Sequence, residues 1–365
     1  MRVIVSAGGT GGHIYPALSI INKIKDYDKN SEFLYIGTTD RMEHEIVPKY
    51  GIPYLGISIK GMNKNIFKSI KSITLLLKSN SIVKKEIKKF NPDIVIGVGG
   101  YVTFPVIYNA KKLGYKTFIH EQNSIPGKSN KLLIRYTDKV AVSLPGSIKY
   151  FPKNKVVYTG NPRSSEVLNV SKASKDSLGL NKNKKLVLIV MGSLGSMTIS
   201  NELLNIVSKF QNKDYEVILV TGKNYYDKFQ KIKVKNVKIV SYLDNMLNVL
   251  KICDLIVTRA GASTIAEITS LGLPSILVPS PYVANNHQFY NAMELVEAKA
   301  AKLLEEKNFT ADNLLYEIDS ILNNQELYSS MHKNALKLGK SDSTDAILKV
   351  ILDLIGSEES GRTNK

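Results

Sequence analysis

The sequence predicts an α/β fold built from two doubly wound domains. Short apolar segments alternate with helical patterns through the first half of the chain, and the same alternation restarts after a polar stretch. Such a rhythm is typical of parallel sheets covered by helices. With 365 residues, 43% of them apolar, the chain is long enough to bury two hydrophobic cores.

Five strands are expected in the first domain. They are Val3–Val5, Glu32–Ile36, Ile94–Val98, Lys116–His120 and Lys139–Val142. The segment from Ser143 to Pro162 is rich in Pro and Gly and is predicted to be a loop that ends the domain near residue 162.

The second domain repeats the pattern and ends in helices. Its expected strands are Leu186–Met191, Glu216–Val220, Val237–Val240, Leu255–Thr258 and Ser275–Val278. Its expected closing helices are Thr310–Leu322, Gln325–Leu338 and Thr344–Ile355, and a disordered tail is expected over residues 357–365.

A glycine-rich run, Gly8-Gly9-Thr10-Gly11-Gly12-His13, follows the first strand directly. Its backbone amides can approach a ligand closely, and Pro16 is expected to start the next helix, Ala17–Ile24. The dinucleotide pattern is disfavoured because position 14 is Ile, and the P-loop pattern because position 13 is His. The run is either a cradle for a phosphate or sugar that carries a titratable His13, or a tight turn with a capping His.

Two more glycine loops follow expected strands, over residues 97–101 and 191–196. Ligands of open α/β sheets bind beyond the carboxyl ends of the strands, so all three loops are expected to line one cleft. A fourth segment, 254–267, is predicted to be a strand, a turn at Gly261 and a helix. Its first turn suits a diphosphate and Glu267 suits a ribose, although an ordinary capped helix has the same pattern.

Polar clusters follow other strands, and each is either a set of sugar ligands or loop capping. They comprise His120-Glu121-Gln122-Asn123, Asn285-Asn286-His287-Gln288 and Asn291. The pair of acids Asp26 and Asp28 lies in a helix-to-strand connection, away from the carboxyl ends of the strands, which disfavours a metal site there. Motifs of zinc enzymes and of serine hydrolases are missing from the sequence.

Charge is distributed unevenly along the chain. The formal net charge is +18, and residues 1–160 carry 25 Lys and Arg against 10 Asp and Glu. Nine lysines and apolar residues interleave over Lys60–Lys89, which indicates either a surface that lies on anionic lipid or a solvated helical face. Nucleic acid is disfavoured as a partner because the cluster has few aromatic or Arg residues.

Compartment is indicated by the single Cys253, which cannot form an internal disulfide and fits a reducing cytoplasm. No apolar run reaches membrane-spanning length, and no signal peptide is expected.

Taken in order, these motifs resemble the bacterial MurG glycosyltransferases over residues 1–355. The resemblance also rests on Gly99-Gly100-Tyr101-Val102, Gly160-Asn161-Pro162-Arg163 and Arg259-Ala260-Gly261-Ala262. It implies a GT-B fold with an acceptor and membrane-binding domain, 1–162, that regains a last helix at about 341–356, and a UDP-GlcNAc-binding domain, 163–340. It further implies inverting transfer of GlcNAc from UDP-GlcNAc to the MurNAc C4 hydroxyl of lipid I, undecaprenyl-pyrophosphoryl-MurNAc-pentapeptide, giving lipid II for peptidoglycan synthesis.

The resemblance also implies that the enzyme is peripheral at the cytoplasmic membrane face, has no cofactor and needs no metal in the chemical step. It makes His13 the candidate general base. The residues that it places at the donor or acceptor are Thr10, Gly11, Gly12, Asn123, Arg163, Ser193, Leu243, Ala262, Ser263, Thr264, Glu267 and Gln288.

Three positions depart from the family pattern: Met191 and Leu194 stand where Gly and Gln are common, and His287 where Gln is common. Two other functions stay open: a UDP-GlcNAc 2-epimerase, which needs no lipid acceptor, and a non-catalytic scaffold that binds a nucleotide sugar at the membrane.

Overall fold

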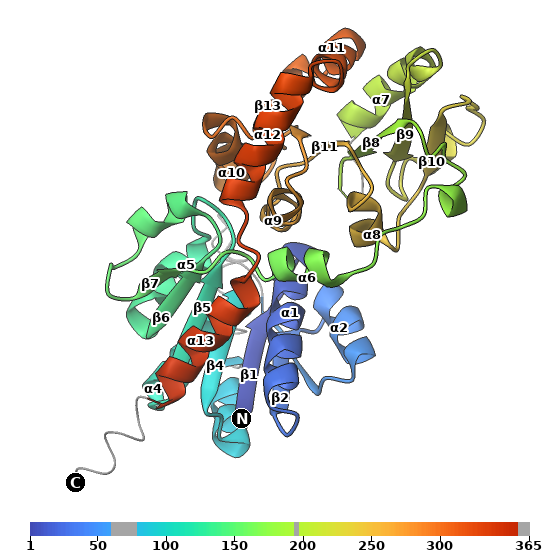
Figure 1. The fold of residues 1–365 in the computed structure, drawn as a ribbon. Coiled ribbons are helices and arrows are strands. Elements are labelled where there is room, and N and C mark those ends of the chain that lie inside the picture. Colours follow the sequence, from blue (N-terminus) through green and yellow to red (C-terminus); the bar gives the residue numbers. More distant parts are fainter. Residues whose placement is uncertain (60–78, 193–196, 357–365) are drawn as a thin grey trace. The chain divides into compact units, whose positions relative to one another are not determined.

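The computed structural model describes residues 1–59, 79–192 and 197–356. The chain divides into two compact units, Met1–Arg163 with Asp342–Lys365, and Ser164–Ser341. The expected tail, 357–365, lies outside the described residues, as does the lysine-rich part 60–78. Each unit contains one parallel sheet with helices on its faces (Figure 1).

Unit 1 has seven strands in the order β3-β2-β1-β4-β5-β6-β7, all parallel. The strands are β1 (Arg2–Ala7), β2 (Glu32–Thr38), β3 (Tyr54–Ile57), β4 (Ile94–Gly99), β5 (Lys116–Glu121), β6 (Lys139–Val142) and β7 (Val156–Tyr158). The helices are α1 (Gly11–Tyr27), α2 (Met42–Ile46), helical residues 79–90, α4 (Thr103–Lys112), α5 (Lys128–Leu133) and α13 (Ser343–Gly356).

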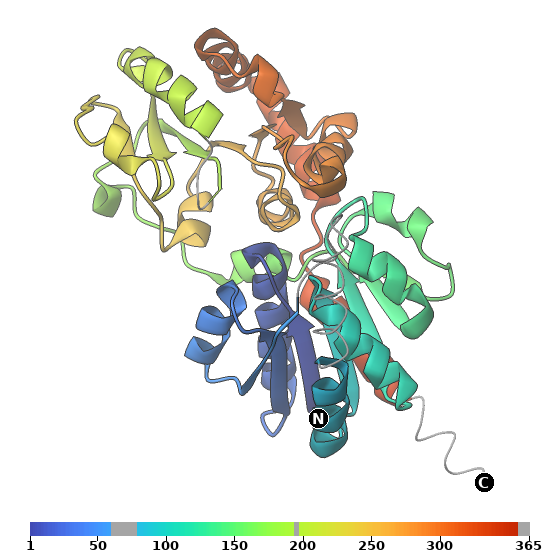
Figure 2. The ribbon, with the colours of Figure 1, turned by 180° about the vertical axis from the view of Figure 1, so that it is seen from behind.

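The central strands of unit 1 are buried on both faces, and their side chains alternate between two cores. Val3 and Val5 of β1 pack with α1 and α13, whereas Ile4 packs with residues 79–90 and α4. Figure 1 shows α13 beside α1, and Figure 2 shows the helices of the opposite face. Side chains of α13 complete the first core: Ile347, Leu348 and Ile351 are buried there.

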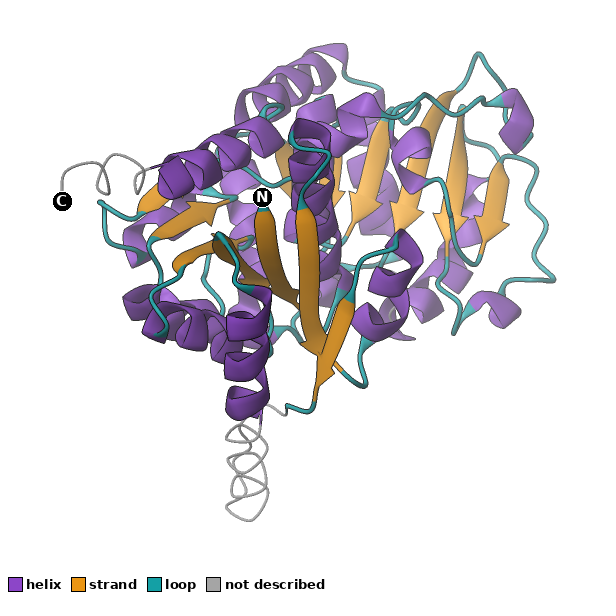
Figure 3. Ribbon diagram, turned by 90° about the horizontal axis from the view of Figure 1, so that it is seen from below, coloured by secondary structure: helices purple, strands orange, loops and turns teal. Residues whose placement is uncertain are grey.

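Unit 2 has six parallel strands in the order β10-β9-β8-β11-β12-β13. The strands are β8 (Lys185–Val190), β9 (Tyr215–Val220), β10 (Val237–Val240), β11 (Leu255–Thr258), β12 (Ser275–Leu277) and β13 (Ala301–Leu303). The helices are α6 (Arg163–Asn169), α7 (Met197–Ile206), α8 (Met246–Leu250), α9 (Ala262–Leu271), α10 (His287–Glu297), α11 (Ala311–Leu322) and α12 (Gln325–Leu338). Figure 3 shows the strands of each sheet as parallel arrows between helices.

Three strands were not predicted, namely β3, β7 and β13. Each is an edge strand of three or four residues whose side chains are mostly half-buried. Because a short edge strand lacks a continuous apolar run, its pattern resembles that of a loop. For the same reason the expected loop 143–162 is wrong in part, since it contains β7 and a 3₁₀ helix, Pro145–Tyr150.

The first helix also begins earlier than predicted. It starts at Gly11, so Pro16 lies inside α1 and not at its first position. The proline is tolerated close to the N-terminus, where only the carbonyl of Gly12 loses an intrahelical partner. Two glycines and His13 therefore form the first turn of α1.

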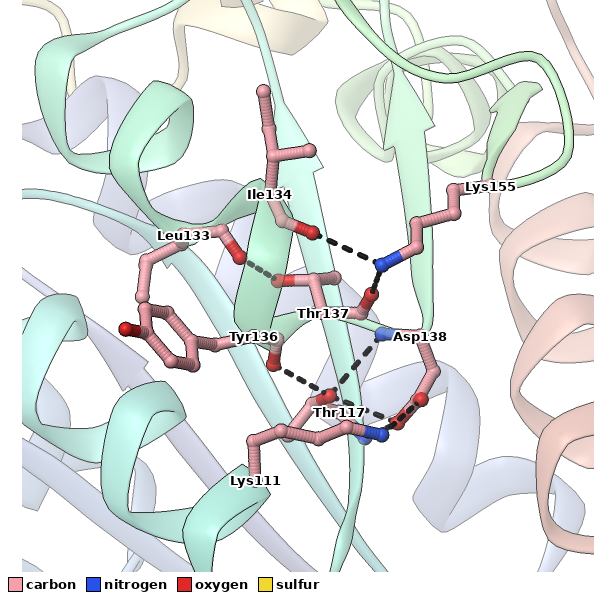
Figure 4. A network of polar contacts seen from close by, with 8 residues as sticks. All are labelled: Lys111, Thr117, Leu133, Ile134, Tyr136, Thr137, Asp138 and Lys155. Atoms are coloured by element: carbon pink, nitrogen blue, oxygen red, sulfur yellow. Dashed lines mark hydrogen bonds and ion pairs between the residues drawn. The ribbon is translucent and has the colours of Figure 1, made fainter.

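A polar network ties α4, β5, β6 and β7 together at the amino-terminal edge of the first sheet (Figure 4). The carboxylate of Asp138 accepts from Thr117 and Lys111, and the ammonium of Lys155 donates to the carbonyls of Ile134 and Thr137. Burial raises the pKa of Asp138, and the hydrogen bonds from Lys111 and Thr117 outweigh that effect and lower it. These contacts fix the amino-terminal edge of the sheet. The glycine loops that follow β1 and β4 lie at the opposite, carboxyl edge.

Candidate functional site

In unit 1 one glycine loop follows the carboxyl end of β1 and another follows that of β4, and the two loops contact each other. The amide of Gly8 donates to the carbonyl of Gly99 over 3.1 Å. A Cβ on Gly100, whose φ is +91°, would lie 2.5 Å from the carbonyl oxygen of Gly8. Only glycine fits such an approach, so the expectation that these two loops lie together is met in unit 1. Residues 193–196 of the third loop lie outside the described residues.

The N-terminus of α1 opens directly from the first of these loops. The amides of His13 and Ile14 both donate to the carbonyl of Thr10, the N-cap residue. The amides of Gly11 and Gly12 precede the helical ladder and stand at the positive end of the helix dipole. Thr10 and Gly12 are exposed, so this end of the helix is accessible to an anionic or hydroxyl-bearing ligand.

His13 is held in one tautomer by the same loop. Its Nδ1 lies 3.0 Å from the carbonyl oxygen of Gly8. A carbonyl can only accept, so Nδ1 carries the proton and the lone pair of the neutral ring is on Nε2. The ring packs over Gly99, where a Cβ would lie 2.6 Å from Cδ2 of His13. This arrangement leaves a base at the end of a parallel sheet, next to a helix N-terminus.

The neighbouring cluster at the end of β5 fits the loop-capping interpretation in three of its four residues. His120, Glu121 and Gln122 are all buried, and their polar atoms contact protein groups. The Nε2–H of His120 donates to the carbonyl of Gly160, and Nδ1 accepts from the amide of Gln122. Burial lowers the pKa of His120 to about 4. Of the two interpretations, loop capping fits these three residues, because they brace the strand end and the turn at Gly160.

This buried imidazole makes stability dependent on pH. The pKa of His120 in the fold is about 4, below its ordinary 6.5, so the unfolded chain takes up the proton first as pH falls. The stability from this residue is complete above the ordinary value and is lost between the two values. We expect this residue to lower the free energy of unfolding by about 2 kcal/mol from about pH 7.5 to about pH 5.

The measurement is urea denaturation of the wild type and His120→Gln at both pH values. The glutamine keeps an amide donor for Gly160 but does not titrate, so its loss of stability on acidification should be smaller. Equal losses in the two proteins would contradict the role of His120.

Asn123 is the member of that cluster whose side chain is only half-buried. Its backbone and side-chain amides donate to Oε1 of Glu121, at 2.9 and 3.3 Å. The other oxygen of Glu121 accepts from Gly127 and Asn130. Glu121 therefore fixes the loop that presents Asn123 at the carboxyl edge of the sheet.

Arg163 ends the first segment of unit 1 and is the first residue of α6. Its backbone amide donates to Oδ1 of Asn161, and its guanidinium carbon lies 5.6 Å from the centre of the Tyr15 ring. Tyr15 belongs to α1 and contacts the position where Gly11 would carry a Cβ. The structure thus places Arg163 beside the helix that starts in the glycine run.

In unit 2 the first turn of α9 follows the end of β11. Gly261 is the N-cap, and Ala262, Ser263 and Thr264 form the first turn. The Oγ of Ser263 is buried and has no hydrogen-bond partner among the described residues. Glu267 lies one turn further and is 7% exposed. The free N-terminal amides and an unsatisfied hydroxyl suit an anion, as the sequence predicted.

Arg259 stands just before that turn, but its charge is already paired. Its guanidinium donates to Oε2 of Glu306 over 2.7 Å and to the carbonyl of Val278 over 3.1 Å. Both side chains are nearly buried. The contact with Val278 joins the ends of β11 and β12, and the pair with Glu306 ties them to the 3₁₀ helix Glu306–Asn308 after β13. Arg259 therefore supports the turn, and an anion at α9 is left to backbone amides and hydroxyls.

Two more predicted residues of unit 2 are Leu243, which follows β10, and Gln288, which follows β12. Leu243 is buried in the loop that follows β10. Asn285 and Asn286 adopt left-handed conformations that turn the chain into α10, which brings Gln288 into its first turn. The side-chain oxygen of Gln288 accepts from the amide of Ser280, which leaves the NH₂ group to donate. Ser193 lies outside the described residues.

Among residues 1–59, 79–192 and 197–356, no group of three or more His, Cys, Asp or Glu side chains could hold a metal ion. Of the disfavoured acidic pair, Asp28 accepts from the amino terminus and from Ser31. Over the same residues, no helix has both the length and the apolar character to cross a membrane.

Comparison with known proteins assigns both units. Residues 3–142 match the model of the glycosyltransferase family 28 N-terminal domain, and residues 186–347 match that of its C-terminal domain. A protein of Bacillus cytotoxicus is 48% identical over 97% of this chain and 100% of its own length. That relative is named UDP-N-acetylglucosamine–N-acetylmuramyl-(pentapeptide) pyrophosphoryl-undecaprenol N-acetylglucosamine transferase. The chain belongs to the MurG family of glycosyltransferases.

Solved structures agree with a GT-B fold, as the sequence predicted. The crystal structure of MurG from Acinetobacter baumannii is 26% identical, with a TM-score of 0.78 over 96% of this chain and 99% of that one. A UDP-GlcNAc 2-epimerase of Neisseria meningitidis, bound to UDP-GlcNAc, is 16% identical, with a TM-score of 0.69 over 97% of this chain and 100% of that one. At that identity the epimerase shares the fold alone.

The departures from the MurG pattern have different surroundings. Met191 is buried in the core of unit 2, so its side chain packs and does not face a ligand. His287 donates from Nδ1 to the carbonyl of Ala284, in the 3₁₀ helix that precedes α10. Leu194 lies outside the described residues.

One residue at the site escaped the sequence prediction. Glu43 of α2 is fully buried, and its carboxylate accepts from the amide of Gly9 over 2.9 Å. It lies 34 positions from Gly9, in a segment whose pattern resembles a short exposed helix. No local spacing connects the two residues, so sequence analysis had no signal for this contact.

Proposed function

We propose that this chain transfers GlcNAc from UDP-GlcNAc to the C4 hydroxyl of MurNAc in lipid I, which yields lipid II for peptidoglycan synthesis. The near full-length relative at 48% identity carries this activity in its name. The observation that carries the mechanism is His13, held by the carbonyl of Gly8 with its Nδ1 protonated. A neutral imidazole in that tautomer presents Nε2 to an attacking hydroxyl.

The chemical step is a single displacement with inversion. The acceptor oxygen forms a bond to the anomeric carbon of GlcNAc while the bond from that carbon to the UDP oxygen breaks. The hydroxyl proton passes to Nε2 of His13, and the electron pair leaves with UDP. The carbonyl of Gly8 then stabilises the imidazolium, because it accepts a hydrogen bond from Nδ1–H. No metal is expected to be needed in this step.

On the acceptor side, we assign binding to the residues around the N-terminus of α1. Thr10 and the amides of Gly11 and Gly12 would contact polar groups of the sugar or its diphosphate. Asn123, fixed by Glu121, would hydrogen-bond the acceptor or the GlcNAc. These contacts would hold the C4 hydroxyl in the orientation needed for attack. Such positioning supplies a large part of the rate gain in group transfer.

On the donor side, we assign the diphosphate to the first turn of α9, with Ala262, Ser263 and Thr264. Glu267 would accept from the ribose hydroxyls and the backbone at Leu243 would pair with uracil. Gln288 would donate to a sugar hydroxyl, and Arg163 and Ser193 would approach the diphosphate or sugar. The positive end of the α9 dipole favours the departing UDP.

The assay that tests this function measures UDP release from UDP-GlcNAc with and without a lipid I analogue. Release that depends on the acceptor, together with a disaccharide product, is the expected result. Formation of UDP-ManNAc without acceptor would instead identify an epimerase. Binding of UDP-GlcNAc without UDP release would identify a scaffold.

We also propose that the protein works peripherally at the cytoplasmic membrane face, where anionic lipid attracts it. Lys84, Lys85, Lys88 and Lys89 are exposed on helical residues 79–90, while Val83 and Ile87 of the same segment are buried in the core. In this part the lysines are therefore available to headgroups, but these two apolar side chains are not. The apolar residues of 66–77 lie outside the described residues.

Sedimentation with vesicles tests that proposal. Binding should require anionic lipid and should weaken as salt rises, because the attraction is screened. A variant with Glu at Lys84, Lys85, Lys88 and Lys89 should bind less. Equal binding to neutral vesicles would contradict the lysine argument.

A further inference from the structure

A single peptide group lies between a buried carboxylate and the imidazole of His13. The peptide that joins Gly8 to Gly9 donates its N–H to Oε2 of Glu43 over 2.9 Å. Its carbonyl oxygen accepts from Nδ1 of His13 over 3.0 Å. The carboxylate, the peptide and the imidazole therefore form one continuous chain of hydrogen bonds.

The surroundings of Glu43 fit an ionised carboxylate. Oε1 accepts from the amide of Thr38 over 3.1 Å and from its hydroxyl over 2.7 Å, and Oε2 accepts from Gly9. All three partners donate, so the group is used only as an acceptor. Burial, followed by the charge of Glu43, raises the pKa of both Tyr35 and Tyr54. The negative charge of Glu43 thus acts on these two tyrosines, which lie on β2 and β3.

Space for this carboxylate is made by glycine at two positions. A Cβ on Gly8 would lie 2.3 Å from Oε1 of Glu43, and a Cβ on Gly37 would lie 2.7 Å from its Cγ. A buried carboxylate is costly, and an apolar side chain would fill the same volume more cheaply. The stability of the fold therefore gives little reason for a charge at this position, whereas the neighbouring base gives one.

We propose that Glu43 is a positioning residue that acts on His13 through the Gly8–Gly9 peptide. A carboxylate that accepts from a peptide N–H makes the carbonyl of that peptide a stronger acceptor. A stronger acceptor holds the proton on Nδ1, keeps Nε2 as the lone-pair nitrogen and stabilises the imidazolium that forms during transfer. The role matches that of a carboxylate hydrogen-bonded to a catalytic histidine, with a peptide inserted between the two.

The inference rests on the proposed role of His13 as the base, and it predicts a property of the imidazole that needs no turnover to measure. In Glu43→Gln one acceptor oxygen becomes an NH₂ group and the charge is lost. The pKa of His13 should then fall by about 0.5 to 1 unit, because an attractive charge is removed. The value of kcat should fall about 10- to 100-fold, as when a partner that orients a functional histidine is removed.

Other titratable groups on neighbouring elements lie near the hydrogen bonds that connect Glu43 to His13. His120 of β5 acts on His13, and Tyr35 of β2 and Tyr54 of β3 face Glu43. Asp40, in the loop before α2, faces Tyr54. Because the pKa of His120 is about 4 and those of both tyrosines are raised, these three groups stay neutral through the range in which an imidazole near its ordinary pKa titrates.

The experiment follows the imidazole carbon and proton signals of His13 by NMR across a pH titration, with His13→Gln to assign them. Wild type, Glu43→Gln, Glu43→Asp and Thr38→Val are compared. Thr38→Val removes one hydrogen bond from Glu43 but keeps both the carboxylate and its contact with Gly9, so it controls for lost stability. Steady-state kcat and the KM for UDP-GlcNAc are measured on the same four proteins.

The expected result is a lower pKa of His13 and a lower kcat in Glu43→Gln, with a KM for UDP-GlcNAc close to wild type. Thr38→Val should lose stability without the shift in pKa. Glu43→Asp, which keeps the charge but shortens its reach, should fall between wild type and Glu43→Gln. If His13 titrates identically in wild type and Glu43→Gln, the carboxylate only shapes the loop and the proposal is overturned.

The role of His13 as the base and the role of Glu43 can be tested separately. If His13→Ala retains normal turnover, the base has been assigned wrongly, whatever Glu43 does to the pKa of His13. If His13→Ala is inactive while Glu43→Gln changes neither the pKa nor kcat, the base stands and the link through the peptide is wrong.

Discussion

Replacing His13 by Ala is expected to lower kcat by about 10²- to 10⁴-fold, the usual contribution of a general base. The acceptor hydroxyl would then lose its proton to water in the transition state. Donor binding should change little, because most residues assigned to UDP-GlcNAc lie in unit 2, and Arg163 and Asn123 of unit 1 are left unchanged. Steady-state kinetics give kcat, and calorimetry gives the affinity for UDP-GlcNAc.

A matched control is His44→Ala. His44 is exposed on α2, where its ring packs against that of Tyr54, and it has no assigned role in the reaction. Its removal should leave kcat within about twofold of wild type, as for most exposed side chains. A near-normal kcat in His13→Ala would exclude His13 as the base.

Replacing Gly99 by Ala is the second change with a large expected effect. The φ of Gly99 is +120°, and an added Cβ would lie 2.6 Å from Cδ2 and 2.8 Å from Nε2 of His13. The imidazole must move, and a displacement of about 1 Å is enough to cost about 10²-fold in rate. The backbone strain should also reduce the free energy of unfolding by about 1 to 3 kcal/mol.

The control for strain is Gly114→Ala. Gly114 also has a positive φ, +88°, but a Cβ there would have no atom of the described residues within 4 Å. This variant should lose stability without a large loss of kcat. Equal losses of kcat in Gly99→Ala and Gly114→Ala would show that strain, and not contact with His13, accounts for the effect.

Much of the architecture could be predicted because short stretches of sequence determine it. The central strands of both sheets are continuous apolar runs, and their carboxyl ends are marked by glycine or polar residues. The edge strands β3, β7 and β13 were missed because they are short and half-buried, so they resemble loops. The start of α1 was misplaced because a run of glycines does not favour a helix until the surrounding structure holds it.

The site was predicted less completely, and the reason is distance along the chain. Whether His120 faces a ligand depends on Gly160, 40 residues away, which takes its Nε2 proton. The function of Glu43 depends on Gly9, 34 residues away. Residues whose partners are close in sequence are easier to predict, and spacing alone predicted the helix turn that Ala262, Ser263 and Thr264 form. Residues that act through distant partners could not be predicted in this way.

The return of α13 to unit 1 has a consequence for the order in which the protein matures during translation. Because Ile347, Leu348 and Ile351 fill the first core, unit 1 stays open on one face until α13 has been synthesised and has packed. Unit 2 is one uninterrupted stretch, 164–341, whose two ends are joined by the hydroxyl of Ser165 and the carbonyl of Ser341. It can therefore finish first, although it is synthesised second. A chain that lacked α13 would carry a complete unit 2 and a unit 1 with an exposed apolar face, and such a face favours aggregation.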